Sequence, residues 1–166
     1  MKKLFLVTLL SVAVAFTACK GKETKVETPL ADANANAPVQ TEEVKGAKDS
    51  DSGNAYGLQT IFFDFDSFSI NEKSKTILAN NAKILKDKGD VSLQIEGHCD
   101  ERGSVQYNLA LGEKRANAVK KYLSTLGISD NRLTLISYGK EKPMSNDHSE
   151  DAWSKNRRAN FVVTSK

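Results

Sequence analysis

Two hydrophobic periods alternate along residues 56–166, one of two residues and one of about 3.6 residues. The first is typical of a strand with one buried face, and the second is typical of an amphipathic helix. The segments follow one another in the order strand, helix, strand, helix, strand, strand. Because helical crossovers commonly join parallel strands, this order predicts a two-layer α/β (α+β) sandwich with helices packed on one face of a mixed sheet.

The strands are predicted from alternating apolar residues. The first lies within residues 58–66 and places Ile61, Phe63 and Phe65 on its core face. The other three are expected at residues 91–97, 132–139 and 157–165. The polar residues 140–156 are expected to form a connection with a single helical turn. Because no long helix separates the last two strands, the final strand is expected at an antiparallel or loop-linked edge of the sheet.

Two long helices are predicted between these strands. Ser69 and Glu72 have the spacing of a capping box that opens the first helix, and Gly89 ends it. The second helix occupies residues 107–127, and Gly127 fits the position after its C-cap. Its buried stripe is expected to consist of Leu109, Gly112, Ala116, Val119, Leu123 and Leu126. A glycine on that stripe indicates close packing, at some cost to the stability of the helix.

The N-terminus has the features of an export signal. Lys2 and Lys3 precede an apolar run, and small residues lead to Cys19. The run is too short and wrongly flanked for a spanning helix, so residues 1–18 are predicted to be a signal peptide. The tetrapeptide "FTAC" resembles a bacterial lipobox, which implies lipidation of Cys19. Lys20 follows, rather than the Asp that retains many such proteins at the inner membrane, so the resemblance favours the outer membrane.

Residues 19–55 show neither hydrophobic period and contain no aromatic residue. Such a segment cannot bury enough apolar surface to offset its ordering entropy, so a lipidated, disordered tether is predicted there. If Cys19 carries lipid, Cys99 has no partner for an internal disulfide, and the domain at residues 56–166 must fold by its own core. The formal net charge of +3 is too small to imply binding of nucleic acid.

The segment "GHCDERG", residues 97–103, carries several reactive side chains. A cysteine enzyme needs its thiolate beside an imidazole, but strand alternation would place His98 and Asp100 on one face and Cys99 on the other. The only other histidine, His148, lies in the polar connection. Metal sites need a second cluster of ligands, which the sequence lacks, so no metal or other cofactor is expected. Cys99 is interpreted as a small buried residue and His98 as a structural one.

Asp100 and Arg115 suggest a different kind of site. Arg115 lies one helical turn after Leu111 and is expected to be partly sheltered near the start of its helix. An arginine can bind a carboxylate in a bidentate fork, and an aspartate can bind an ammonium group. Together they would suit the head of a zwitterionic amino acid. On spacing alone, a salt bridge between Asp100 and Arg115 that fixes the loop is the simpler interpretation.

Four segments, "FFDFDSFSI", "IEGHCDERGSVQYNLALGEKRANAV", "SYGKEKP" and "SKNRRANFVV", closely resemble the OmpA-like domain family over residues 58–164. The resemblance implies a non-enzymatic protein that binds peptidoglycan noncovalently and tethers the outer membrane to the cell wall. Asp100 would bind the amine of diaminopimelate in the peptide stems, and Arg115 would bind its carboxylate. The matching Asp66 and Leu111 would line the same site.

The resemblance implies further features of the chain. Asn108 and Arg158 match secondary motif positions, and a periplasmic protein of the Tol system is an implied partner in envelope integrity and cell division. The domain would face the periplasm. Cys99 stands where the family commonly carries Thr or Ala. Two alternatives remain open: a periplasmic cysteine or wall-cleaving hydrolase that uses Cys99 and His98, and a module that binds only protein.

Overall fold

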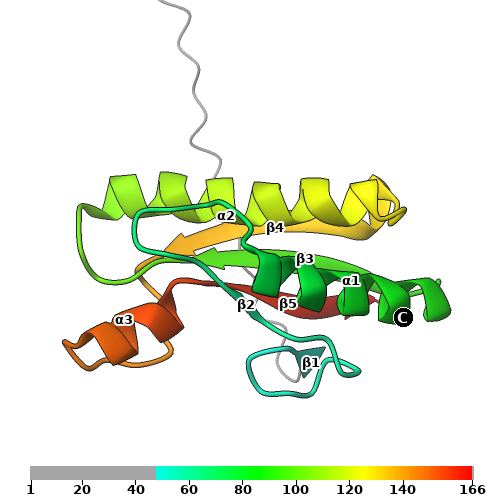
Figure 1. Cartoon of the computed structure of the whole chain (residues 1–166), viewed down its shortest axis with the longest axis horizontal. Coiled ribbons are helices and arrows are strands. Elements are labelled where there is room, and N and C mark those ends of the chain that lie inside the picture. Colours follow the sequence, from blue (N-terminus) through cyan, green and yellow to red (C-terminus); the bar gives the residue numbers. More distant parts are fainter. Residues whose placement is uncertain (1–47, 166) are drawn as a thin grey trace, which may run out of the picture. The chain divides into compact units, whose positions relative to one another are not determined.

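The computed structural model describes residues 48–165, so the predicted signal peptide, the lipidated Cys19 and most of the predicted tether lie outside the described residues. Figure 1 shows the order and arrangement of the elements. They are β1 (Lys48–Asp49), β2 (Ile61–Phe62), α1 (Glu72–Asp87), β3 (Ser92–His98), α2 (Val105–Thr125), a 3₁₀ turn (Asp130–Arg132), β4 (Leu133–Gly139), α3 (Glu150–Asn156) and β5 (Arg158–Ser165). Within residues 48–165, no helix combines the length and the hydropathy needed to cross a membrane.

The five strands form one mixed sheet in the order β1-β5-β3-β4, and β2 also pairs with β5. β3 and β4 are parallel, as the helical crossover between them predicts, and β5 is antiparallel to each of its neighbours. The predicted fold class is confirmed, but the predicted edge position of β5 is wrong. β2 and β3 run in the same direction with a gap of one strand between them, and β5 fills that gap.

The core lies between the sheet and two helices. Leu93 and Ile95 of β3 share one buried apolar cluster with Leu78 of α1 and Val119 of α2, so both helices cover the same face of the sheet. α2 lies so close to β3 that a Cβ on Gly97 would overlap the carbonyl oxygen of Gly112. The close packing predicted from Gly112 is confirmed. α3 lies apart from α1 and α2, at the end of the sheet where β5 begins (Figure 1).

The segment that begins with β2 leaves the sheet earlier than its apolar alternation predicts. Only Ile61 and Phe62 are strand residues, and Ile61 and Phe63 are buried as expected. Phe65, however, is 60% exposed, so its predicted place in the core is wrong. The chain turns at this point, and Asp66 adopts the left-handed backbone conformation with φ of 52°. Alternation identifies which side chains could share a face but not where the strand ends.

Both long helices begin at residues other than those predicted. Asn71, not Ser69, caps α1, because its Oδ1 accepts a hydrogen bond from the amide of Ser74 at 2.9 Å. Ser104 caps α2 in the same way, so this helix begins before residue 107. Leu109 is exposed and is not part of the buried stripe of α2. The C-terminus of α2 agrees with the prediction, since Gly127 has φ of 89°.

The ordered domain starts before the predicted boundary at residue 56. β1 pairs with the C-terminal half of β5, and Ala55 is a fully buried member of the core. The Ser50 hydroxyl is buried and donates to Oδ1 of Asn160 at 2.8 Å. Residues 48–55, which composition assigns to the tether, therefore belong to the domain. The connection between β4 and β5 is also more regular than predicted, because α3 extends over seven residues.

Candidate functional site

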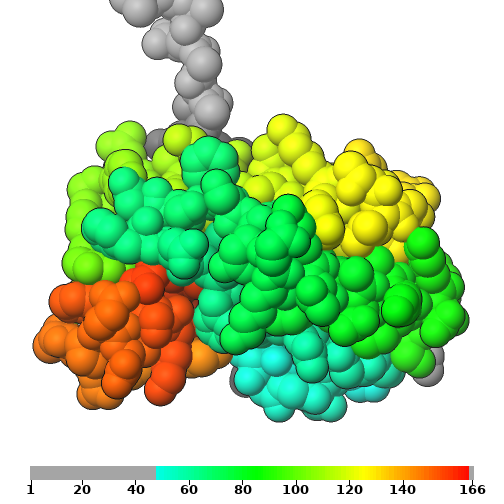
Figure 2. Space-filling model, in the orientation of Figure 1, coloured from blue at the N-terminus to red at the C-terminus, as the bar shows by residue number. Residues whose placement is uncertain are grey.

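A cavity of about 220 Å³ opens where three segments of the chain meet: the turn after β2, the loop from β3 to α2, and the first turns of α2. In the space-filling view, the turn after β2 lies between the start of α2 and the segment around α3 (Figure 2). The cavity is lined by Phe65, Asp66, Cys99, Asp100, Arg102, Gly103, Tyr107, Asn108, Leu111 and Arg115. The structure therefore brings together five of the six residues that the resemblance implies for binding. Arg158 is the exception.

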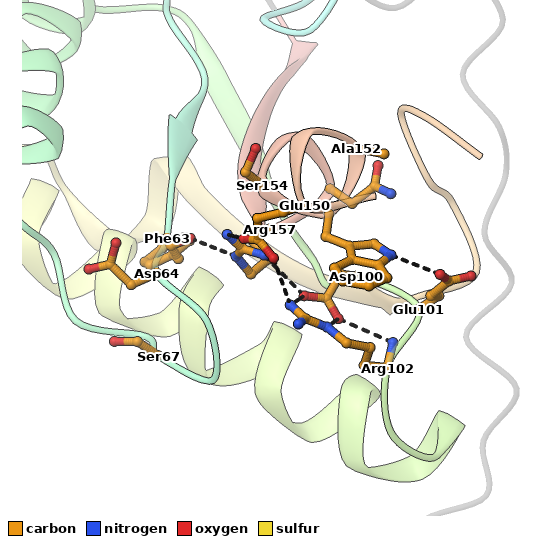
Figure 3. A network of polar contacts seen from close by, with 12 residues as sticks. Phe63, Asp64, Ser67, Asp100, Glu101, Arg102, Glu150, Ala152, Ser154 and Arg157 are labelled. Carbon is orange, nitrogen blue, oxygen red and sulfur yellow. Dashed lines mark hydrogen bonds and ion pairs between the residues drawn. The ribbon is translucent and has the colours of Figure 1, made fainter. Parts of the chain in front are cut away.

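Asp100 is buried, and two arginine side chains bind its carboxylate (Figure 3). Nε of Arg102 donates to Oδ1 at 3.2 Å, and Nη2 of Arg102 donates to Oδ2 at 2.7 Å. Nη1 of Arg157 donates to Oδ2 from the other side at 3.3 Å. Burial alone would raise the pKa of the Asp100 carboxyl, but these hydrogen bonds, chiefly those from Arg102, lower the pKa below its ordinary value. Asp100 is therefore a carboxylate at neutral pH.

Arg115 is fully buried, although only partial shelter was predicted. Its guanidinium donates to three main-chain carbonyl oxygens: Nε to Ser67 at 2.8 Å, Nη1 to His98 at 2.7 Å and Nη2 to Asp64 at 3.3 Å. Among residues 48–165, no carboxylate lies within ion-pair distance of it, so the salt bridge between Asp100 and Arg115 considered above is absent there. Burial lowers the pKa of Arg115, while the guanidinium remains the charged form at neutral pH.

A guanidinium has five N–H groups, and three of them bond to carbonyl oxygens, so two are not bonded to oxygen among residues 48–165, where the Cys99 thiol is the nearby side chain. The Arg115 side chain borders the cavity, so a carboxylate placed there would meet both a positive charge and donors of suitable geometry. A buried charge without a partner of opposite sign is unfavourable. The site is therefore suited to bind an anionic group.

Asp66 and Tyr107 form the rim of the cavity. The Tyr107 hydroxyl donates to the Asp66 carboxylate and so joins the turn after β2 to the first turn of α2. This hydrogen bond raises the pKa of Tyr107. Both side chains are exposed, so both can meet a ligand. Asp66 was predicted to lie in the site, whereas Tyr107 was not.

Asn108 and Leu111 shape the cavity from α2. Nδ2 of Asn108 donates to the carbonyl oxygens of Arg102 at 2.8 Å and Ser104 at 3.1 Å, which holds the loop in place. Leu111 is nearly buried and offers an apolar wall. Asn108 thus has a clear structural role, and Leu111 suits contact with the aliphatic part of a ligand.

Arg158 lies away from the cavity, and its neighbour Arg157 takes part in the site instead. Nε of Arg158 donates to Oδ2 of Asp51 at 2.7 Å, next to β1. Arg157 joins Asp100 to the start of α3, since its Nη2 donates to Oε1 of Glu150 at 2.7 Å. Adjacent residues of an extended chain point in opposite directions, so the pair "RR" indicated that one arginine could face the site. The family resemblance selected Arg158, and Arg157 was not predicted.

Glu101 connects the loop after β3 to α3. Its carboxylate accepts hydrogen bonds from Nε1 of Trp153 at 2.8 Å and from Nδ1 of His148 at 2.7 Å. The bond from His148, followed by that from Trp153, lowers the pKa of Glu101, and the same contact raises the pKa of His148. Trp153 is thereby held beside Arg102, whose guanidinium lies 4.2 Å from the centre of the indole ring. None of these contacts was predicted from the sequence.

His98 and Cys99 point away from one another, as strand alternation predicts. The His98 ring stacks on Tyr138 with centroids 5.5 Å apart, whereas the Cys99 thiol donates to the carbonyl oxygen of Asn108 at 3.3 Å. Burial raises the pKa of Cys99 to about 11, so the thiol is protonated at neutral pH. Asp100 lines the same cavity as Cys99, so the prediction that it shares a face with His98 is wrong. β3 ends at His98, and alternation ends with it.

Among the side chains of the described part of the chain, no group of three or more His, Cys, Asp and Glu residues is arranged to hold a metal ion. The cavity is instead lined by a buried cation, Arg115, a buried carboxylate, Asp100, and an apolar side chain, Leu111. These are the groups needed to bind a molecule that carries both charges.

The chain is similar to several known proteins. The OmpA family matches residues 62–157. The peptidoglycan-associated lipoprotein of Pseudomonas aeruginosa is 41% identical over 127 residues, which cover 76% of this chain and 74% of that protein. The protein of the same name from Pseudomonas putida is 37% identical over 155 residues, covering 93% of this chain and 92% of that protein.

A solved structure extends the likeness to three dimensions. The crystal structure of the peptidoglycan-associated lipoprotein from Burkholderia pseudomallei is 44% identical, with a TM-score of 0.61, and the match covers 63% of this chain and 89% of that chain. The resemblance expected from the four sequence segments is confirmed. The chain therefore belongs to the OmpA family, in which it resembles the peptidoglycan-associated lipoproteins.

Proposed function

We propose that this chain is a lipid-anchored outer-membrane protein whose domain faces the periplasm and binds peptidoglycan without cleaving it. The ligand is the diaminopimelate residue of the peptide stems. The observation that carries the proposal is the guanidinium of Arg115, which is buried beside a cavity and has no carboxylate partner among residues 48–165. The names of the relatives support peptidoglycan as the polymer that is bound. The resemblance of "FTAC" to a lipobox supports a lipid anchor at Cys19.

Each group of the cavity has a part in binding. Arg115 binds the carboxylate of the diaminopimelate head with its two remaining N–H groups, and Asp100 binds the ammonium group. Leu111 contacts the methylene chain that extends from this head, while Asp66 lies at the rim. Each charge-assisted hydrogen bond contributes about 1.5–3 kcal/mol, which gives a modest affinity for one site. Many anchored copies facing one polymer then add avidity.

The protein acts as a tether and not as a hydrolase. The Cys99 thiol is protonated at neutral pH, and its hydrogen bond to Asn108 directs it toward α2, while the His98 ring stacks on Tyr138. The thiol and the imidazole therefore do not face one another at the cavity. A protein of the Tol system is the proposed periplasmic partner, on the strength of the family resemblance.

Sedimentation with purified peptidoglycan tests the proposal. Asp100→Asn and Arg115→Lys remove the charge or the planar fork with little change in volume, and each is expected to lower the bound fraction at least tenfold, about 1.4 kcal/mol. Asp87→Asn, at the exposed end of α1, is the matched control and should bind as the wild type does. Circular dichroism verifies that the variants remain folded, because Arg115 also holds three carbonyl groups.

The chemistry of the wall provides a second control. Peptidoglycan with lysine in place of diaminopimelate lacks the carboxylate that Arg115 would bind, so the wild type should not sediment with it. Equal binding to both walls, or full binding by both variants, would exclude this site. Soluble muropeptides released by the wild type, seen by mass spectrometry, would instead support a hydrolase. Failure to sediment with either wall would leave a module that binds only protein.

A further inference from the structure

The position that an ammonium ligand would take on Asp100 is already filled by the protein. Oδ1 accepts from the amide of Arg102 at 3.1 Å and from its Nε at 3.2 Å. Oδ2 accepts from Nη2 of Arg102 at 2.7 Å and from Nη1 of Arg157 at 3.3 Å. A carboxylate offers about four lone-pair positions, so all of them are occupied. A ligand can reach Asp100 only by displacing one of the two arginines.

The side chain of Arg102 is the one that can leave. Arg157 is only 7% exposed and is held by two further bonds, from Nε to the Phe63 carbonyl oxygen at 3.1 Å and from Nη2 to Glu150 at 2.7 Å. Arg102 is 32% exposed. Its guanidinium lies between two rings, 4.1 Å from the centre of Phe65 and 4.2 Å from that of Trp153. Its main chain is fixed by Asn108, so any displacement involves the side chain alone.

Glu150 is placed to receive the displaced guanidinium. Its Oε1 accepts from Arg157, while its Oε2 lies 3.7 Å from Nη2 of Arg102. Figure 3 shows Arg102 below Asp100 and Glu150 above it, on the side of α3. Glu150 is 61% exposed, so it can follow Arg102 without disturbing the core. The same guanidinium therefore lies within ion-pair distance of two carboxylates at once, and only that of Asp100 lines the ligand cavity.

We propose that Arg102 determines the specificity of the site by competing with the ligand for Asp100. The inference rests on the function proposed above. In the free protein, Arg102 occupies Asp100. When diaminopimelate binds, its carboxylate is held by Arg115, its ammonium replaces the guanidinium on Asp100, and Arg102 moves to Glu150. An acetylated amine carries no charge and cannot replace Arg102, so a ligand in which both amines are acetylated is rejected.

Only molecules in which Arg102 has left Asp100 can bind the ammonium group. The observed association constant of the wild type is therefore the intrinsic constant multiplied by the fraction of molecules in that state. Removal of the competitor should therefore tighten binding and weaken discrimination between a charged and a neutral nitrogen. Glu150 should matter only while Arg102 is present, because its part is to hold the displaced side chain. If Arg102 and Glu150 each only stabilised the fold, the effect of changing Glu150 would not depend on the presence of Arg102.

Isothermal titration with free meso-diaminopimelate tests these statements on the whole chain. Arg102→Ala is expected to bind on the order of threefold to tenfold more tightly than the wild type. It should also bind diaminopimelate with both amines acetylated, which the wild type should reject. Glu150→Gln should bind severalfold more weakly, and the double variant should match Arg102→Ala. Lys121→Ala, an exposed change of equal charge on α2, is the matched control and should leave binding unaltered.

Fluorescence provides a readout that a purely structural role would not produce. Trp153 is the only tryptophan of the chain, and Arg102 lies against its indole. Diaminopimelate should shift the emission of the wild type toward that of free Arg102→Ala, and it should leave the emission of that variant unchanged. If Glu150→Gln weakens binding equally with and without Arg102, Glu150 acts through Arg157 and the proposal is wrong.

The outcomes distinguish this inference from the function on which it rests. Binding by the wild type that is equal to or tighter than that of Arg102→Ala would overturn the role of Arg102 and leave the proposed function intact. If Arg102→Ala binds diaminopimelate and the wild type does not, Arg102 competes so strongly that it blocks Asp100 completely. Failure of the wild type and of every variant to bind would remove the proposed function, and this inference with it.

Discussion

At the scale of single residues, the two charged ends of the cavity are in opposite states. Asp100 is saturated by arginine donors, whereas Arg115 binds main-chain carbonyl groups and has no carboxylate partner among residues 48–165. The anionic end of the site is therefore closed by the protein itself, and the cationic end is ready for a ligand. A zwitterion would be held first by its carboxylate, which raises the local concentration of its ammonium at Asp100. The order of these two contacts follows from the unequal pairing of the two residues.

Cys99 offers a test of the environment of the cavity wall. Burial raises the pKa of its thiol to about 11 from the ordinary 9.0, so at pH 8 the thiolate is about 100-fold scarcer than in the unfolded chain. In the full-length chain carrying Cys19→Ser, iodoacetamide should modify native Cys99 at least about 100-fold more slowly than in 8 M urea, and faster as the pH rises. Mass spectrometry follows the reaction. Equal rates in the two states would contradict a buried, protonated thiol and would strengthen the hydrolase alternative.

The residues of the site differ in how far the sequence could identify them. Asp66, Asp100, Asn108, Leu111 and Arg115 are implied by the resemblance of their motifs to the OmpA-like family, and the structure places all of them around one cavity. Residues contributed from near α3 could not be found in this way. They approach Asp100 only because β5 inserts beside β3, and that placement is a property of the whole sheet.

At the scale of elements, the contact between α2 and β3 sets the shape of the site. Gly97 and Gly112 allow the helix to rest directly on the strand, and this places Arg115 beside the loop that follows β3. The sequence could predict the close approach from a glycine on the buried stripe. It could not predict that the stripe excludes Leu109, because the position where α2 leaves the sheet depends on the loop that precedes it.

Gly97→Ala tests this contact. The added methyl group would overlap the carbonyl oxygen of Gly112, so the free energy of unfolding should fall by about 1–3 kcal/mol or more. Gly89→Ala is the matched control, since a Cβ there meets no atom within 4 Å and its φ is not in the left-handed region. That change should be neutral or stabilise the chain by up to about 1 kcal/mol. Urea midpoints measure both, and equal midpoints for the two variants would refute the close contact.

At the scale of the whole molecule, the domain is larger than its hydrophobic pattern suggests. Alternation and helical period identified β3, β4 and both long helices, because each of these buries a regular apolar face. Residues 48–55 have no such pattern. They are attached to the rest of the domain by hydrogen bonds and by a single buried alanine. Composition therefore assigned them to the tether. If the tether leads to a lipid anchor, it joins the domain at β1, on the outer edge of β5.

Truncation tests where the domain begins. A chain that starts at residue 56 loses β1 and the carboxylate of Asp51, which leaves buried Arg158 without its bond at 2.7 Å. Removal of one partner of a buried ion pair costs about 3–5 kcal/mol, so this chain should unfold at a clearly lower urea concentration than one that starts at residue 48. Tryptophan fluorescence and circular dichroism follow both transitions. If the two chains share one midpoint, residues 48–55 contribute nothing to stability, and the boundary at residue 56 predicted from composition would be the correct one.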